Sequence, residues 1–232
     1  MSELNNARHG NIRQAIMPGF IFVVILWLIK TLEFQFGFSL HQLGVYPGAL
    51  EGVIGILTGP LIHGSYEHLA SNSLALLLLF AALFYGYPKS KYWTLAIIWL
   101  GSGLGTWLFA REAWHFGASG LTHGLFFYLF VISVLRRDKR SIALMMMVFF
   151  MYGGMIMTIF PREPGISYEY HFFGALFGLI TALIFRKSDP KPIEKQYSWE
   201  IEDKEDELIG DEWQTDQAQE HTMDEEEQHK LH

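Results

Sequence analysis

Apolar residues in this chain are gathered into long runs that short polar segments separate. A helix that crosses a bilayer needs about 20 mostly apolar residues. Six runs meet or approach that length, near residues 16–36, 68–86, 92–110, 118–135, 141–160 and 168–186. The first run is the weakest, because Lys30 and Glu33 lie in its last turns. The pattern predicts an all-α polytopic membrane protein with six transmembrane helices.

The segment between the first two runs, residues 36–65, is moderately apolar and contains several glycines and two prolines. Glycine and proline interrupt regular structure, so this stretch is too broken to cross a bilayer alone. We expect a long, structured first outer loop that dips toward the membrane.

The positions of Lys and Arg predict the orientation. Cytoplasmic loops of membrane proteins carry an excess of these residues. If the N-terminus is cytoplasmic, the inside segments hold 11 Lys and Arg residues and the outside segments hold 3. We therefore expect both termini inside, and an integral protein of a bacterial inner membrane.

Charge is divided sharply along the chain. The net charge of −7 combines a formal +5 on residues 1–193 with −12 on residues 194–232. A segment dense in like charge and poor in aliphatic residues is typical of disorder. We expect a cytoplasmic N-terminal segment at 1–15, a membrane domain at 16–186 and an acidic tail at 187–232. The chain has no cysteine, which excludes disulfides and thiolate chemistry.

Three of the runs contain two glycines four residues apart. Such pairs let helix backbones approach closely in a membrane, where lipid supplies no hydrophobic drive for association. The pairs are Gly101 with Gly105, Gly120 with Gly124, and Gly174 with Gly178. The first pair is typical of packing alone, whereas the other two lie next to reactive residues.

Ser119 immediately precedes Gly120, and His171 lies three residues before Gly174. If the fourth and sixth helices pack through their glycines, the serine and the histidine can meet at the same depth. A serine hydroxyl becomes a useful nucleophile when a neutral imidazole accepts its proton. Glu169 is near His171 in the sequence but points elsewhere on a helix, so we expect a Ser–His dyad.

His68 and Asn72 are four residues apart at the start of the second helix, and both carry N–H donors. Acyl transfer needs donors aimed at the oxyanion that forms on the attacked carbonyl. These two side chains, with the backbone N–H of Ser119, are candidates for an oxyanion hole. Polar side chains at membrane depth are costly and are functional candidates for that reason.

Taken together, these motifs resemble those of the rhomboids, a family of intramembrane serine proteases. The resemblance covers residues 16–186 and rests on His-Gly-Ser-x-x-His-Leu-x-x-Asn at 63–72, Gly-x-Ser-Gly at 117–120 and His-x-x-Gly-x-x-x-Gly at 171–178. It implies Ser119 as nucleophile, His171 as general base, and His68 and Asn72 as oxyanion donors. The supporting positions that it implies are His63, Gly117, Gly120, His123, Gly174 and Gly178.

The resemblance also implies a six-helix bundle that cuts transmembrane protein substrates in or near their membrane segments. It implies no cofactor, no metal and no nucleic-acid partner, and membrane lipid as the surroundings. Two features depart from the family pattern. His123 stands where the family often has an aromatic residue that stacks on the catalytic histidine, and residues 37–62 lack the usual Trp-Arg pair of the first outer loop.

Two other classes of protein fit parts of the pattern. A rhomboid-like protein without activity would bind membrane proteins and leave them uncut. A metal-binding membrane protein would use the histidines expected toward the outer side, since imidazoles suit zinc and copper. Those histidines are His63, His68, His115, His123 and His171.

Overall fold

A computed structural model describes residues 11–161 and 165–192 of the chain. Of the acidic tail expected at 187–232, residues 193–232 lie outside the described residues. The longer helices are α2 (Ile12–Phe36), α4 (Tyr66–Gly86), α5 (Lys91–Phe109), α6 (Ser119–Arg136), α7 (Lys139–Tyr152) and α8 (Tyr168–Phe185). The shorter ones are η1 (His41–Leu43), η2 (Leu50–Gly52), α3 (Gly55–Thr58), η3 (Gly59–Leu61) and η4 (Gly153–Ile159).

Within the described residues, five helical segments are long and apolar enough to cross a membrane. They are α2, α4, α6, α7 together with η4, and α8. The all-α polytopic fold is confirmed, but α5 is not among the five, although it has 19 residues. Its glycines and its buried Ser102 and Thr106 lower its hydropathy, and α5 packs beside α6 and α8.

The fifth predicted run divides into two kinds of helix. α7 ends at Tyr152, and residues 153–159 continue as the 3₁₀ segment η4. Gly153 and Gly154 begin this segment, and glycine is a poor former of α-helix. The predicted span near 141–160 is therefore confirmed as a helical segment, and its second half has 3₁₀ geometry.

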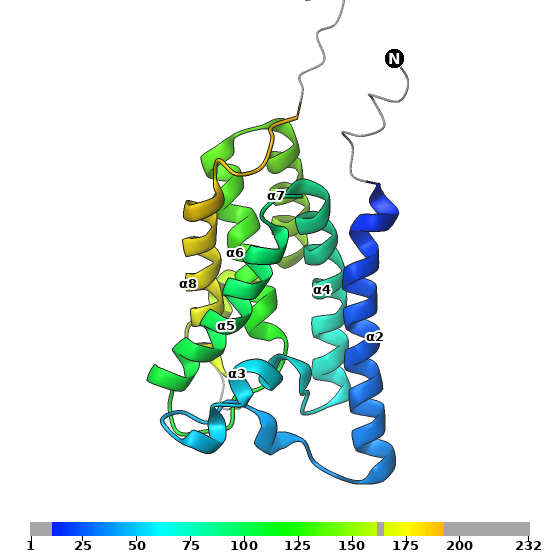
Figure 1. The fold of residues 1–232 in the computed structure, drawn as a ribbon, viewed down its shortest axis with the longest axis vertical. Coiled ribbons are helices and arrows are strands. Elements are labelled where there is room, and N and C mark those ends of the chain that lie inside the picture. The colour runs from blue at the N-terminus through cyan, green and yellow to red at the C-terminus, as the bar shows by residue number, and fades with distance from the viewer. Residues whose placement is uncertain (1–10, 162–164, 193–232) are drawn as a thin grey trace, which may run out of the picture. The chain divides into compact units, whose positions relative to one another are not determined.

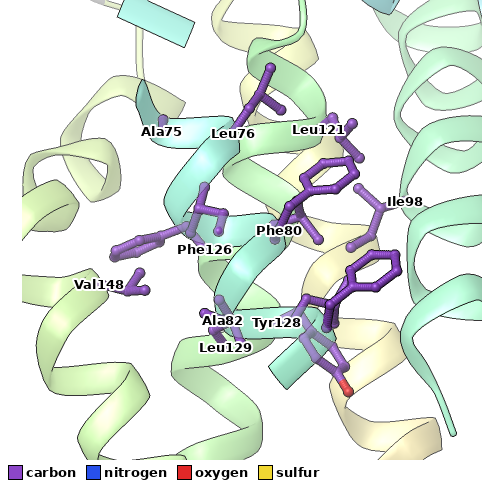
Figure 2. Packing of buried hydrophobic residues seen from close by; sticks show 14 of the residues in the cluster. Ala75, Leu76, Phe80, Ala82, Ile98, Leu121, Phe126, Tyr128, Leu129 and Val148 are labelled. Carbon is purple, nitrogen blue, oxygen red and sulfur yellow. The ribbon is translucent and has the colours of Figure 1, made fainter. Parts of the chain in front are cut away.

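Helix α6 is the centre of the bundle. It packs against α4, α5, α7 and α8, and most of its residues are buried. α2 lies at one edge beside α4, while α8 lies at the opposite edge beside α5 and α6 (Figure 1). The apolar core gathers side chains from all six longer helices, and Figure 2 labels residues of four of them. Labelled examples are Leu76 and Phe80 of α4, Ile98 of α5, Leu121 and Phe126 of α6, and Val148 of α7.

α6 and α8 approach each other very closely. A Cβ atom added to Gly174 would collide with the carbonyl oxygen of Gly120, and one added to Gly178 would collide with that of Gly124. The two backbones therefore touch directly, as the glycine spacing predicts. Any larger residue at Gly174 or Gly178 would separate these helices.

The glycines of α5 are used differently. Gly101 lies against the ring of Phe177, and Gly105 lies against the ring of Phe173, both from α8. Here the missing side chains leave room for aromatic rings. This agrees with a packing role for the first glycine pair.

The loop between α2 and α4 is tied to the bundle by backbone and indole hydrogen bonds. The indole N–H of Trp107 donates to Ala49 O at 2.9 Å, and that of Trp99 donates to Leu57 O at 3.1 Å. Val45 and His115 exchange two backbone hydrogen bonds of 2.8 Å. Tryptophans of α5 thus anchor the loop, which itself lacks the Trp-Arg pair.

The charges near the end of α2 are also paired. Lys30 Nζ donates to Glu33 Oε2 at 2.9 Å, and the second Glu33 oxygen accepts from the backbone N–H of Leu40 at 3.0 Å. Lys30 also reaches the carbonyl oxygen of Gly64 at 3.3 Å. The two charges that weakened the sequence prediction therefore join α2 to the loop.

A buried polar cluster closes the end of the bundle opposite Ser119. Arg136, only 5 % exposed, donates to Asp138 Oδ2 at 2.9 Å and to the carbonyl oxygen of Asp189 at 2.8 Å. The Asp189 carboxylate accepts from the backbone N–H of Lys89 at 2.6 Å and from the hydroxyl of Ser90. Asp189 thereby fixes the segment after α8 to the α4–α5 loop and to α6.

Burial raises the pKa of Tyr87 in this cluster to about 12. Burial by itself would also raise the pKa of Asp138, but hydrogen bonds from Ser141 and Arg136 outweigh it and lower the pKa of that carboxyl below its usual range. At neutral pH the phenol is therefore uncharged and the Asp138 carboxylate is ionised.

The first prediction concerns the α6–α8 contact. Gly174→Ala adds one methyl group against the Gly120 carbonyl, so we expect a loss of about 1–3 kcal/mol of stability, typical of overpacking. For a chain of this size that lowers Tm by several degrees. The matched control is Gly154→Ala, because nothing lies within 4 Å of the added Cβ there. Equal thermal unfolding of the two variants in detergent would contradict the observed contact.

The second prediction concerns the polar cluster around Asp189. Asp189→Ala leaves the Lys89 N–H and the Ser90 hydroxyl without their acceptor, so it should cost about 1.5–3 kcal/mol, the range for hydrogen bonds to a charged group. Ser188→Ala, at an exposed neighbour, should be neutral. Thermal unfolding in detergent measures both. An unchanged Tm in Asp189→Ala would mean that the cluster adds nothing to stability.

Candidate active site

The start of α6 depends on glycine for two separate reasons. Gly117 has φ +117°, a backbone conformation that favours glycine. A Cβ atom there would also lie 2.7 Å from Cε1 of His68. The backbone N–H of Gly117 donates to Gly59 O at 2.9 Å, which fixes the turn against η3. The Gly-x-Ser-Gly motif thus delivers Ser119 to the first position of α6, close to His68.

His63 holds the same turn from the other side. It is 2 % exposed, and its Nε2 accepts from the backbone N–H of Ala118 at 3.4 Å. Burial lowers the pKa of His63 to about 3, so the imidazole is neutral and can accept this hydrogen bond. The centroid of its ring lies 5.2 Å from that of the His68 ring.

The imidazoles of His123 and His171 stack face to face. Their ring centroids are 3.9 Å apart and their planes differ by 8°. His123 Nδ1 also donates to the carbonyl oxygen of Ser119 at 2.7 Å, because a carbonyl can only accept. A histidine at the position of the expected aromatic residue therefore does stack on His171, and it also bonds to the backbone of Ser119.

The tautomer of neutral His171 follows from its partner. Its Nδ1 lies 3.0 Å from the carbonyl oxygen of Thr158, so Nδ1 carries the hydrogen. Nε2 then holds the lone pair that a general base requires. His171 is 8 % exposed, as is Ser119.

No direct hydrogen bond joins the side chains of Ser119 and His171 among the described residues. The Gly120–Gly174 contact brings their two helix ends together, and His123 links the Ser119 carbonyl to the ring of His171. Catalytic hydrogen bonds are often long before substrate binds and tighten in the complex. The missing hydrogen bond is therefore compatible with a dyad that forms when substrate binds.

His68 and Asn72 occupy the first two turns of α4. Ser65 caps that helix by accepting the N–H of His68 at 3.1 Å. Asn72 is 5 % exposed, and its Nδ2 has no hydrogen-bond partner among the described residues. A buried donor without a partner is costly, so the Asn72 amide is a candidate to donate to a bound ligand.

The remaining candidates have structural partners. Glu169 lies 3.5 Å from Arg111 Nε and makes no hydrogen bond to His171. His115 bonds to Ser167 Oγ at 2.6 Å and to Arg111 O at 3.0 Å, and burial lowers its pKa. Within residues 11–161 and 165–192, no three His, Asp or Glu side chains are grouped to hold a metal. Nothing in the described residues favours the metal-binding alternative.

Thr158 is the residue that sequence reasoning missed. It lies in η4, and its hydroxyl is 2.7 Å from His123 Nε2 while its carbonyl faces His171. The sequence around Thr158 predicts an unbroken apolar helix, and a single threonine in such a helix does not indicate a functional site. The 3₁₀ geometry that turns Thr158 toward the imidazoles was not visible in the pattern.

Comparison with known proteins finds bacterial relatives of similar length. The chain is 31% identical over 179 residues to an uncharacterized protein of Mycobacterium tuberculosis and to one of Mycobacterium bovis, covering 73% of this chain and 75% of each relative. It is 27% identical to an uncharacterized protein of Mycobacterium leprae, covering 73% of this chain and 71% of that one. No solved structure matches it.

The model of the Rhomboid domain matches residues 50–188, a stretch that includes Ser119, His171 and the first turns of α4. That match covers more than half of the chain. Five helical segments of the described chain also suit a membrane by length and composition. This integral membrane protein therefore belongs to the rhomboid family.

Proposed function

We propose that this protein is an intramembrane serine endopeptidase that hydrolyses peptide bonds in or near transmembrane segments of other membrane proteins. Rhomboids are usually proteases of this kind, although some members are inactive. The main support is the contact of α6 with α8, because Ser119 precedes Gly120 and His171 lies one turn before Gly174. Sites built on packed helices hold their geometry well.

In the proposed reaction, Ser119 Oγ attacks the carbonyl carbon of the scissile bond while its proton passes to His171 Nε2. The tetrahedral intermediate collapses when His171 returns that proton to the leaving amine, which departs. Water then attacks the resulting ester and gives a proton to His171. Collapse of the second intermediate frees the new carboxyl terminus and restores the Ser119 hydroxyl.

The developing oxyanion needs donors already in place. Ala118, the N-cap of α6, has no side chain that can cap the helix, so the first-turn N–H groups are open to a ligand. Asn72 contributes a buried Nδ2 without a partner, and His68 lies against Gly117. We propose the Ser119 N–H, His68 and Asn72 as the oxyanion hole.

We further propose that both termini are cytoplasmic and that the site opens toward the outer side of a bacterial inner membrane. The orientation rests on the excess of Lys and Arg in the loops predicted to be inside. The bacterial setting rests on the mycobacterial relatives. Membrane proteins with a transmembrane segment are the proposed substrates, and the domain at 16–186 is the proposed catalytic unit.

The third prediction tests the dyad. Ser119→Ala and His171→Ala should each abolish cleavage of a transmembrane substrate in proteoliposomes. The double variant should be hardly worse than either single one, because the two residues act as a unit. Ser133→Ala is the matched control, since Ser133 is a buried serine at the far end of the same helix. Cleavage that persists in Ser119→Ala would refute the dyad.

Covalent labelling separates the protease from the two alternatives. A serine-directed fluorophosphonate should label the wild type at Ser119 and fail to label Ser119→Ala. An inactive rhomboid-like binder or a metal-binding protein should not be labelled at this residue. Wild-type protein that stays unlabelled and cuts no membrane protein would favour the inactive class.

The fourth prediction tests Asn72. Asn72→Ala should lower kcat by roughly tenfold to a thousandfold, the effect of losing one oxyanion donor. Its Tm and KM should change little, because Nδ2 makes no hydrogen bond within the described structure. Ser71→Ala, on the exposed side of α4, serves as control. Wild-type kcat with a lowered Tm would mean that Asn72 has a structural role instead.

A further inference from the structure

Two imidazoles are hydrogen-bonded to one residue of η4. The carbonyl oxygen of Thr158 is 3.0 Å from His171 Nδ1, and its hydroxyl is 2.7 Å from His123 Nε2. The same hydroxyl also lies 2.9 Å from the carbonyl oxygen of Met155. Thr158 thus contacts the proposed general base with its backbone, and contacts the ring stacked on that base with its side chain.

Counting donors and acceptors shows what the hydroxyl does. His123 Nδ1 meets the carbonyl of Ser119, so in a neutral ring Nδ1 carries the hydrogen and Nε2 is the acceptor. The Thr158 hydroxyl then donates to Nε2. If the ring carries both hydrogens, the same hydroxyl accepts from Nε2 and donates to Met155 O. The hydroxyl therefore satisfies His123 in either state.

These contacts fix the planes of both rings. His123 is held at one nitrogen by the Ser119 carbonyl on α6 and at the other by Thr158 on η4. His171 lies flat on it, 3.9 Å away between centroids, and is held at its edge by the Thr158 carbonyl. A ring with hydrogen bonds at both nitrogens has little freedom to turn about χ2. The orientation of His171 therefore depends on that of His123.

No carboxylate among the described residues hydrogen-bonds to Nδ1 of His171. In a Ser–His–Asp triad an acid holds the imidazole in the required tautomer. Here Glu169 is turned toward Arg111, at 3.5 Å from its Nε. The Thr158 carbonyl is the hydrogen-bond partner of His171 Nδ1, and it can only accept.

We propose that Thr158 is the positioning residue of the Ser119–His171 pair, and that its hydroxyl is required because His123 occupies the stacking position. The carbonyl sets the tautomer of His171, and the hydroxyl holds the His123 ring on which His171 lies. The proposal builds on the proposed protease function. A stacking ring without nitrogens would need no such hydroxyl.

A double-mutant cycle tests the hydroxyl. Thr158→Val keeps the shape and the backbone carbonyl but removes the hydroxyl. In the full chain in detergent micelles it should lower kcat by about tenfold to a hundredfold, the effect of a slightly misplaced catalytic group. In the His123→Phe background the same change should lower kcat by less than about twofold, since no Nε2 remains to be held.

Two controls separate positioning from folding. Thr158→Ser restores the hydroxyl and should recover activity to within about threefold of wild type. Thr181→Val makes the same change at a buried threonine of α8 whose hydroxyl bonds only to carbonyls of its own helix, and it should leave kcat unchanged. Equal losses from Thr158→Val in both backgrounds, or no rescue by Thr158→Ser, would overturn the proposal.

A second measurement does not require protease activity. Nitrogen-15 spectra of histidine-labelled protein should show a protonated Nδ1 and an unprotonated Nε2 for neutral His171, in both wild type and Thr158→Val. The His123 signals should shift on Thr158→Val and recover in Thr158→Ser. The opposite His171 tautomer would refute the role of the carbonyl even in an active enzyme. A protein that gives the expected spectra but cuts no substrate and reacts with no fluorophosphonate would refute the protease function. That result would leave the role of Thr158 in holding the rings intact.

Discussion

The direct backbone contact between α6 and α8 is the constraint on which the rest of the site depends. Helices in lipid gain no hydrophobic energy from meeting, so they associate through close packing and polar contacts. Gly174 and Gly178 let α8 rest on the carbonyl groups of Gly120 and Gly124. Ser119 is the neighbour of one contact residue, and His171 is one turn from another. Their separation is therefore set by the backbone, with no flexible side chain between them.

The buried polar groups of the bundle are of two kinds. Some hydroxyls bond only to carbonyls of their own helix, as those of Ser133 and Thr181 do. Other groups bond to a different element, both in the cluster around Asp189 and near Ser119. His63 accepts from the turn before α6, and the stacked imidazoles bond to η4. Such contacts hold side chains in one geometry, which a catalytic site requires.

Asn72 is one of eight described residues with a buried side-chain polar atom that lacks a hydrogen-bond partner. A buried amide donor without a partner costs about 1–3 kcal/mol. Bundles in lipid otherwise satisfy their polar groups internally, because no water is present in the hydrocarbon region. Asn72 lies one turn after His68 on α4, and the missing partner of its Nδ2 supports its proposed role as an oxyanion donor.

The sequence by itself determined the membrane class, the positions of the long helices within a few residues, and the glycine face shared by α6 and α8. Helical periodicity and glycine spacing are local, so a single chain segment reveals them. Gly-x-Ser-Gly and His-x-x-Gly likewise tied Ser119 and His171 to those contacts. The fold could therefore be predicted nearly whole, and so could the position of Ser119 and His171 next to the α6–α8 contact.

Only the tertiary structure decided how the loop is anchored, how η4 begins and what holds the imidazoles. Trp99 and Trp107 bond to residues more than forty positions away in the loop, and Thr158 meets His123 from 35 positions away. No periodicity encodes which carbonyl a distant N–H will reach. Such pairings arise when separate helices pack. They also depend on backbone geometry, which changes to 3₁₀ at Gly153 and Gly154 although the apolar pattern continues unchanged. The identity of the partners is therefore a property of the assembled bundle.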